Sequence, residues 1–112
     1  MTYRVILTTT AMQAIEVHAR YIAETGLAPE TAARWLERVL EAGASLERFP
    51  HRCGVAKEDA YRPYEVRRIR ANGFVLFFTI VEDTRTIWVI GARHERRQPS
   101  AKDLPERIEG LD

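Results

Sequence analysis

Four residues near the end of the chain carry, or can carry, positive charge within five positions. The cluster consists of Arg93, His94, Arg96 and Arg97, interrupted by one acid, Glu95, and it directly follows an apolar run. Such a run repels itself unless something anionic lies near it. It therefore indicates a docking site for nucleic-acid phosphate or an acidic protein surface. The alternative is a solvated strand end, paired with Glu95 or with the acidic tail.

A second group of arginines lies a short way upstream. It consists of Arg67, Arg68 and Arg70, which alternate with Val66 and Ile69 in part. Because side chains alternate between the two faces of a strand, Arg68 and Arg70 should share one face and Arg67 the other. An arginine on an exposed sheet face would extend the cationic site. A charged edge strand that resists aggregation explains these residues equally well.

Other kinds of catalytic or ligand site receive little support. His94 is a candidate general base because it lies among cations, although a hydrogen-bonding role is the simpler explanation. The single cysteine, Cys53, cannot form an intramolecular disulfide, and no Cys/His pair has zinc-ligand spacing. There is also no phosphate-binding glycine loop, nucleophile elbow or paired-carboxylate signature. The sequence predicts no metal and no cofactor.

Length and composition indicate a single domain over residues 1–112, with residues 99–112 as a tail that could form a short helix. The chain has 112 residues, 46% of them apolar and 29% charged, and a net charge of +1. Residues 62–97 contain eight arginines and four acids, so the basic excess lies there. The longest apolar run, Phe74–Val81, is far shorter than the roughly 20 residues of a membrane span. No leader-length apolar stretch opens the chain, so we expect a cytosolic protein without a membrane partner.

Periodicity predicts a strand at the start and then two helices. Thr10 and Gln13 form a capping box for the first helix, and Gly26 supplies its left-handed stop. Pro29 suits the first position of the second helix, which Pro50 ends. The predicted core face of that helix comprises Leu36, Val39, Leu40, Gly43, Leu46 and Phe49.

After a loop over residues 50–63, the remainder reads as strands. They cover residues 64–70, 74–81 and 86–90, and Asn72-Gly73 is a strong hairpin signal between the first two. The predicted order is β-α-α-β-β-β, an α+β fold with a helical hairpin packed on one face of a small curved antiparallel sheet. The other face should be concave, partly exposed and lined by arginines.

Several local motifs, in this order and spacing, resemble one known family. They are Thr10-Ala11, Tyr21-Ile22-Ala23-Glu24, Ala32-Ala33, Leu46-Glu47-Arg48-Phe49-Pro50 with Gly54, Val66-Arg67-Arg68-Ile69, Gly73-Phe74-Val75-Leu76-Phe77-Phe78 and Arg93-His94-Glu95-Arg96-Arg97. From Tyr3 to about Pro99 the chain resembles the RelE/ParE superfamily of bacterial toxins from type II toxin–antitoxin (plasmid stabilisation) systems. The resemblance implies the same α+β fold and a cognate antitoxin as partner.

The superfamily has two functional groups. RelE-like members are ribosome-dependent, metal-independent mRNA endoribonucleases, whereas ParE-like members inhibit DNA gyrase. This sequence has Val75 where the ribonucleases tend to have arginine, and it has no tyrosine beyond Tyr64. We therefore favour the ParE-like group.

The two groups would use the basic residues differently. In a ParE-like protein, the candidate target-binding residues are Arg67, Arg68, Arg93, His94, Arg96 and Arg97. In the alternative ribonuclease, which acts on mRNA in the ribosome, Arg68, Arg93, Arg96 or Arg97 would hold the phosphate and His94 would be the base. A non-toxic member that only binds its antitoxin is a third possibility.

Overall fold

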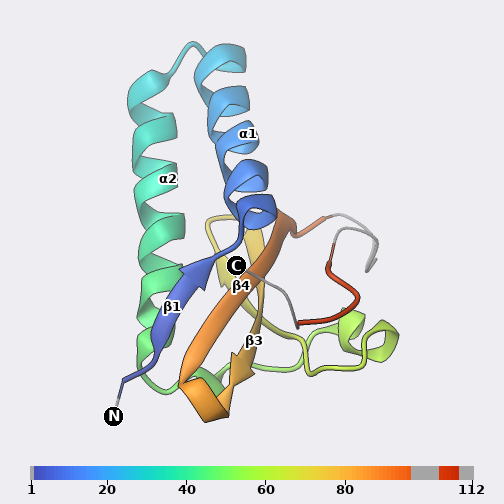
Figure 1. Cartoon of the computed structure of the whole chain (residues 1–112). Helices are drawn as coiled ribbons and strands as arrows, with labels where there is room; N and C mark the ends of the chain where they lie inside the picture. The colour runs from blue at the N-terminus through green and yellow to red at the C-terminus, as the bar shows by residue number, and fades with distance from the viewer. Residues whose placement is uncertain (1, 97–103, 109–112) are drawn as a thin grey trace.

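The computed structural model describes residues 2–96 and 104–108 (Figure 1). Two helices and four strands follow one another in the predicted order β-α-α-β-β-β. The elements are β1 (Arg4–Leu7), α1 (Thr9–Thr25), α2 (Pro29–Ala44), β2 (Arg67–Ala71), β3 (Phe74–Val81) and β4 (Thr86–His94). Four short 3-10 turns join them: η1 (Ser45–Glu47), η2 (Pro50–Arg52), η3 (Lys57–Tyr61) and η4 (Glu82–Thr84). The predicted α+β class is confirmed.

The sheet is mixed, so the prediction of a purely antiparallel sheet is wrong. Its strand order is β1-β4-β3-β2, and β1 pairs with β4 in parallel. The other two pairings are antiparallel. The meander β2-β3-β4 returns the last strand beside β1 in the same direction, which leaves β4 covered on both edges. Its nearly continuous apolar sequence fits that central place.

The helix ends differ in detail from the predicted ones. Thr8, not Thr10, caps α1: its hydroxyl accepts from the amide of Ala11 at 3.2 Å, and its own amide donates to the carbonyl of Val89 at 3.0 Å. The pairing with β4 thus fixes where the strand stops and the helix begins. At the other end Gly26 stays right-handed, and Leu27 takes the left-handed conformation with φ of 50°. Pro29 opens α2 as predicted.

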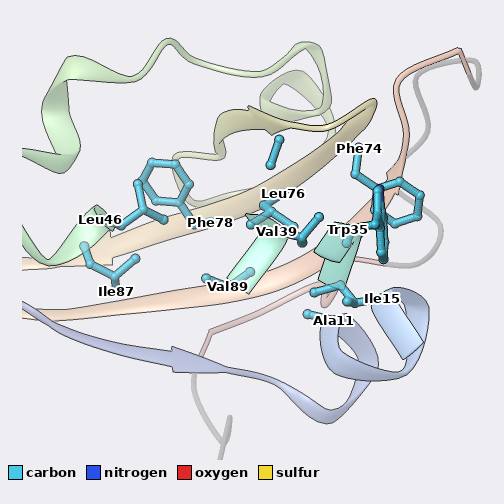
Figure 2. Packing of buried hydrophobic residues seen from close by; sticks show 12 residues of the cluster. Ala11, Ile15, Trp35, Val39, Leu46, Phe74, Leu76, Phe78, Ile87 and Val89 are labelled. Atoms are coloured by element: carbon cyan, nitrogen blue, oxygen red, sulfur yellow. The ribbon is translucent and has the colours of Figure 1, made fainter. Parts of the chain in front are cut away.

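The main core lies between the helical hairpin and one face of the sheet (Figure 2). Alternate residues of β3, namely Phe74, Leu76 and Phe78, point into it. The helices contribute Ala11, Ile15, Trp35 and Val39, as the helical periodicity requires. The indole of Trp35 donates to the carbonyl of Asn72 at 3.1 Å and so fixes α2 to the β2–β3 hairpin. Asn72 and Gly73 both have positive φ, which confirms the predicted two-residue turn.

A β-bulge in β4 changes which face its last residues occupy. Phe77 pairs with Gly91 and Phe78 with Val89, so Ile90 is an extra residue. Ile90 packs in a second apolar cluster, opposite the helices, and a Cβ on Gly91 would point to the same side. After the bulge, each side chain of β4 lies on the face opposite to the one that unbroken alternation would give it.

The face opposite the helices is more covered than predicted. Val75, Phe77 and Ile90 are buried there, together with Ala56, Val66 and Leu104. The covering chain is η3 with its neighbours and the described tail residues 104–108, which form no helix. Residues 50–63, predicted as a loop, contain η2 and η3. The guanidinium of Arg62 donates to the carbonyl of Leu104 at 2.9 Å. The hydroxyl of Tyr64 donates to the carbonyl of Pro105.

No helix within residues 2–96 and 104–108 has the length and apolar character that crossing a bilayer requires.

Two glycines test the packing on the two faces of the sheet. A Cβ on Gly43, in the last turn of α2, would meet Leu76 Cδ1 at 3.6 Å, an ordinary contact, whereas one on Gly91 would lie 2.6 Å from Leu104 Cδ2. Gly43→Ala should therefore raise the free energy of unfolding by about 0.5–1 kcal/mol, because alanine favours the helix. Gly91→Ala should lower it, because Leu104 has to move. Urea denaturation measures the change in the free energy of unfolding for each variant. A lower free energy of unfolding for Gly43→Ala would contradict this packing.

Candidate functional site

A groove bordered by cations lies on the sheet face opposite the helices. Its volume is about 320 Å³. The residues that line it are Lys57, Glu58, Arg68, Arg70, Val75, Phe77, Arg93, His94, Glu95 and Arg96. We call this the basic groove. It brings together residues from β2, β3, η3 and the end of β4 that lie up to 39 positions apart in the sequence.

The strand register explains why the arginines of β2 reach the groove. Arg68 pairs with Phe77 and Arg70 with Val75, and paired residues lie on the same face. The groove therefore has Arg68 and Arg70 along one side, with Lys57 and Arg96 contributed by η3 and the turn after β4. Glu58 and Arg93 also line the groove, but they pair with each other and their charges cancel. The four cations are therefore opposed by the carboxylate of Glu95. The excess of positive charge suits an anionic or acidic ligand.

Arg93 forms the floor of the groove and is not an exposed cation. Its Nη1 lies 2.8 Å from Glu58 Oε2, and both side chains are only 6% exposed. The guanidinium also lies over the ring of Phe77, 4.6 Å from its centroid. A buried, charge-assisted pair of this kind holds η3 against the end of β4. The bulge makes this possible, because it turns Arg93 away from the helices.

His94 faces the helical side and lies in the wall beside the groove. Its Nδ1 accepts a hydrogen bond from the amide of Arg96 at 3.1 Å. A neutral imidazole has one ring lone pair, so this bond leaves Nε2 as a donor. The arrangement counts against His94 as a general base and suits it to hold the turn that carries Arg96.

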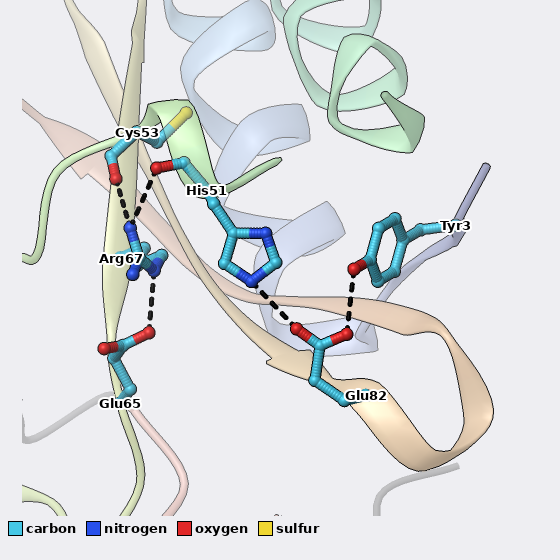
Figure 3. Close-up of polar contacts among 6 residues, drawn as sticks. All are labelled: Tyr3, His51, Cys53, Glu65, Arg67 and Glu82. Atoms are coloured by element: carbon cyan, nitrogen blue, oxygen red, sulfur yellow. Dashed lines mark hydrogen bonds and ion pairs between the residues drawn. The ribbon is translucent and has the colours of Figure 1, made fainter. Parts of the chain in front are cut away.

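Arg67 lies outside the groove, as the predicted alternation requires. It contacts Glu65 at 2.7 Å and donates to the carbonyls of Cys53, at 2.5 Å, and His51, at 3.3 Å (Figure 3). These bonds hold the segment after η2 against β2. Arg97, also a predicted site residue, lies outside the described residues. The groove thus unites Arg68, Arg93, His94 and Arg96 with Arg70, which shares the face of Arg68 as the alternation predicts. Lys57 is a further lining residue that no pattern in the sequence predicted.

A second depression, the apolar groove, lies where α1 meets the ends of β3 and β4. Its volume is about 540 Å³. It is lined by Thr10, Gln13, Ala14, Val17, His18, Tyr21, Phe74, Ala92, Arg93 and His94. Val17 and Tyr21 are largely exposed although they are apolar. Their spacing of four residues, beside the predicted core stripe, was the signal in the sequence for a second apolar face on α1.

His18 sits between the apolar groove and the core. Its ring centroid lies 4.6 Å from that of Phe74, 4.8 Å from that of Trp35 and 6.0 Å from that of His94. Burial among these rings lowers the pKa of His18 from its ordinary value, and the electrostatic interaction with the nearby His94 lowers that pKa further. Protonation of His18 is therefore less favourable in the folded chain than in the unfolded chain.

Comparison with known proteins agrees with this fold. Residues 5–99 match the family described as the ParE toxin of the type II toxin–antitoxin system parDE. A solved structure of the chromosomal ParDE toxin–antitoxin system from P. aeruginosa is similar, with a TM-score of 0.67 and 15% identity. The match covers 83% of this chain and 96% of that one. No curated relative matches the sequence.

The buried ion pair beneath the basic groove should be a strong determinant of stability. Glu58→Gln removes the carboxylate charge that faces the buried guanidinium of Arg93, so we expect a loss of about 3–5 kcal/mol in the free energy of unfolding. Glu65→Gln is the matched control: Glu65 is 51% exposed and also pairs with an arginine. Glu65→Gln should lower the free energy of unfolding by less than about 1 kcal/mol. Urea denaturation would contradict the assignment if the two losses were equal.

The lowered pKa of His18 should make stability depend on pH. The unfolded chain binds a proton below the ordinary pKa of 6.5, whereas the folded chain resists it, so stability falls as pH drops below about 6.5. The loss stops once the pH is below the folded-state pKa. His18→Phe keeps the ring packing and should reduce this acid sensitivity. Urea denaturation at pH 7.5 and at pH 5.5 measures the stability that the wild type and His18→Phe each lose on acidification. Equal losses in the two proteins would contradict the prediction.

Proposed function

Because this chain belongs to the ParE toxin family of type II toxin–antitoxin systems, we propose that it acts by inhibiting DNA gyrase. A toxin of such a system has a cognate antitoxin as its partner. The family and the positive charge of the basic groove, which suits an anionic or acidic surface, support this proposal. Gyrase acts on the chromosome, so we also propose that the toxin works in the cytoplasm.

We propose the basic groove as the surface that contacts the target. The observation that carries this proposal is the convergence of Lys57, Arg68, Arg70 and Arg96 on one groove, opposed by Glu95. In this proposal Arg93 supports the groove from below, and His94 holds the turn. Arg67 serves the packing of the segment after η2, and Arg97 remains a predicted contact.

The ribonuclease alternative is not favoured. Two of its candidate residues are already engaged: Arg93 pairs with Glu58, and the lone pair of His94 accepts from Arg96. No tyrosine lines the groove among the described residues, and the hydroxyl of Tyr64 donates to Pro105. The side chains that face the groove can stabilise negative charge, but the predicted base, His94, has its Nδ1 engaged with the amide of Arg96.

We further propose that an antitoxin segment packs in the apolar groove. Val17 and Tyr21 expose apolar surface there, beside His94. An acidic, amphipathic segment that orders on binding would bury these side chains and place carboxylates near the cations at the end of β4.

A supercoiling assay with purified gyrase tests the target and the groove together. The wild-type toxin should inhibit supercoiling, and Arg68→Ala combined with Arg70→Ala should raise the concentration needed by roughly tenfold, because two charge contacts are lost. Inhibition should also weaken with added salt.

The matched control is the pair Arg34→Ala and Arg38→Ala, which removes two exposed arginines from α2 and should leave inhibition unchanged. No inhibition by the wild type would overturn the gyrase proposal. Equal losses in both double variants would overturn the groove while leaving the target in place.

A further inference from the structure

Phe49 is exposed although it lies between two buried residues of its motif, Leu46 and Pro50. It belongs to the motif Leu46-Glu47-Arg48-Phe49-Pro50, and the helical periodicity predicted it in the core. That prediction is wrong. Leu46 and Pro50 are fully buried, whereas Phe49 between them is 79% exposed. The motif therefore anchors a turn at two points and presents an aromatic ring to solvent.

The backbone that presents this ring is strained. Phe49 has φ of 50° and ψ of 52°, the left-handed conformation, which costs a bulky residue about 1–2 kcal/mol. Glycine or asparagine would fit this position at lower cost. Neither the packing nor the turn geometry requires phenylalanine here, so the stability of the fold does not explain it.

The strained turn is held by several hydrogen bonds. Arg52 Nη1 donates to the carbonyls of Arg48 at 2.6 Å and Phe49 at 3.0 Å, and its Nη2 donates to Ser45 Oγ at 2.9 Å. On the β1 side, the amide of Tyr3 donates to the carbonyl of Glu47 at 2.8 Å. The turn is thus rigid before any partner arrives.

Polar and aromatic groups surround the turn. Glu82 lies 2.8 Å from both the Tyr3 hydroxyl and His51 Nε2, so η4 is linked to η2 and to the residue that precedes β1 (Figure 3). The guanidinium of Arg85 lies over the ring of Tyr3, 4.3 Å from its centroid, and Arg85 also has a left-handed backbone. Exposed aromatic and arginine side chains held in fixed positions are typical of protein–protein interfaces.

This surface is separate from both grooves. Phe74 pairs with His94 at the groove end of the sheet, and Val81 pairs with Thr86 at the other end, beside η4. Seven residues of extended strand separate these ends by roughly 24 Å. A partner that contacts both the basic groove and Phe49 therefore has to be a large folded surface or a long segment.

We propose that Phe49 is an aromatic anchor that inserts into an apolar pocket on gyrase, as a second point of contact distant from the basic groove. This inference rests on the proposed function. A projecting ring needs a pocket that exists before binding, and a folded enzyme can offer one, whereas a segment that orders only on the toxin fills grooves. The exposed Arg48 beside the ring suits a pocket with carboxylates at its rim.

The test compares Phe49→Asn, Phe49→Tyr and Leu27→Asn in the supercoiling assay and in antitoxin binding by calorimetry. Leu27 is a matched control because it is also apolar, 87% exposed and left-handed, with φ of 50°, at the tip of the helical hairpin. Asparagine tolerates this conformation, so both asparagine variants should unfold at the same or a higher temperature than the wild type.

We expect Phe49→Asn to raise the inhibitory concentration about tenfold or more, as the loss of an interface anchor does. Phe49→Tyr should retain most inhibition, and Leu27→Asn should match the wild type. All three variants should bind antitoxin with unchanged affinity. Unchanged inhibition by Phe49→Asn, or a loss confined to antitoxin binding, would overturn the inference. If the wild type itself does not inhibit gyrase, the proposed function fails first, and that result is distinct.

Discussion

The position of one extra residue in β4 constrains the rest of the structure. Ile90 forms a bulge in a strand that is paired on both edges, and it shifts every later residue to the opposite face. Arg93 consequently points away from the helices and reaches Glu58, while His94 points toward His18 and Phe74. Without the bulge, the guanidinium of Arg93 would face the helical core. The ion pair, the floor of the basic groove and the wall between the two grooves all depend on this shift.

The ion pair also explains how a sheet face can be both packed and charged. Glu58 and Arg93 neutralise each other in a buried setting and hold η3 over the sheet. Because their charges cancel, the cations left to act on a ligand are those around the rim, from β2, η3 and the turn after β4. The apolar groove and the Phe49 turn lie on other parts of the molecule, so the fold offers three distinct surfaces to its partners.

Much of the fold could be predicted from local pattern. The order of elements, the Asn72-Gly73 turn, Pro29 at the start of α2 and the division of Arg67 from Arg68 and Arg70 all follow from backbone preferences and side-chain alternation. The predictions of the α1 cap and of the direction of β1 were wrong because contacts with a segment distant in the sequence fix both features. Thr8 caps α1 because its amide bonds Val89, and β1 lies parallel to β4 because the meander returns beside it.

The α+β class, the toxin family and the excess of arginine in the second half of the chain could all be predicted from the sequence. Those properties reside in composition, short-range periodicity and motif order, which need no knowledge of contacts. Contacts between distant segments settle which arginines line the basic groove, that His94 Nδ1 accepts from the amide of Arg96, and that Phe49 is exposed. These outcomes depend on a bulge, a buried ion pair between residues 35 positions apart and a left-handed turn held by Arg52. Each arises from contacts across the sheet or from packing around a turn, which the local periodicity of the sequence does not encode.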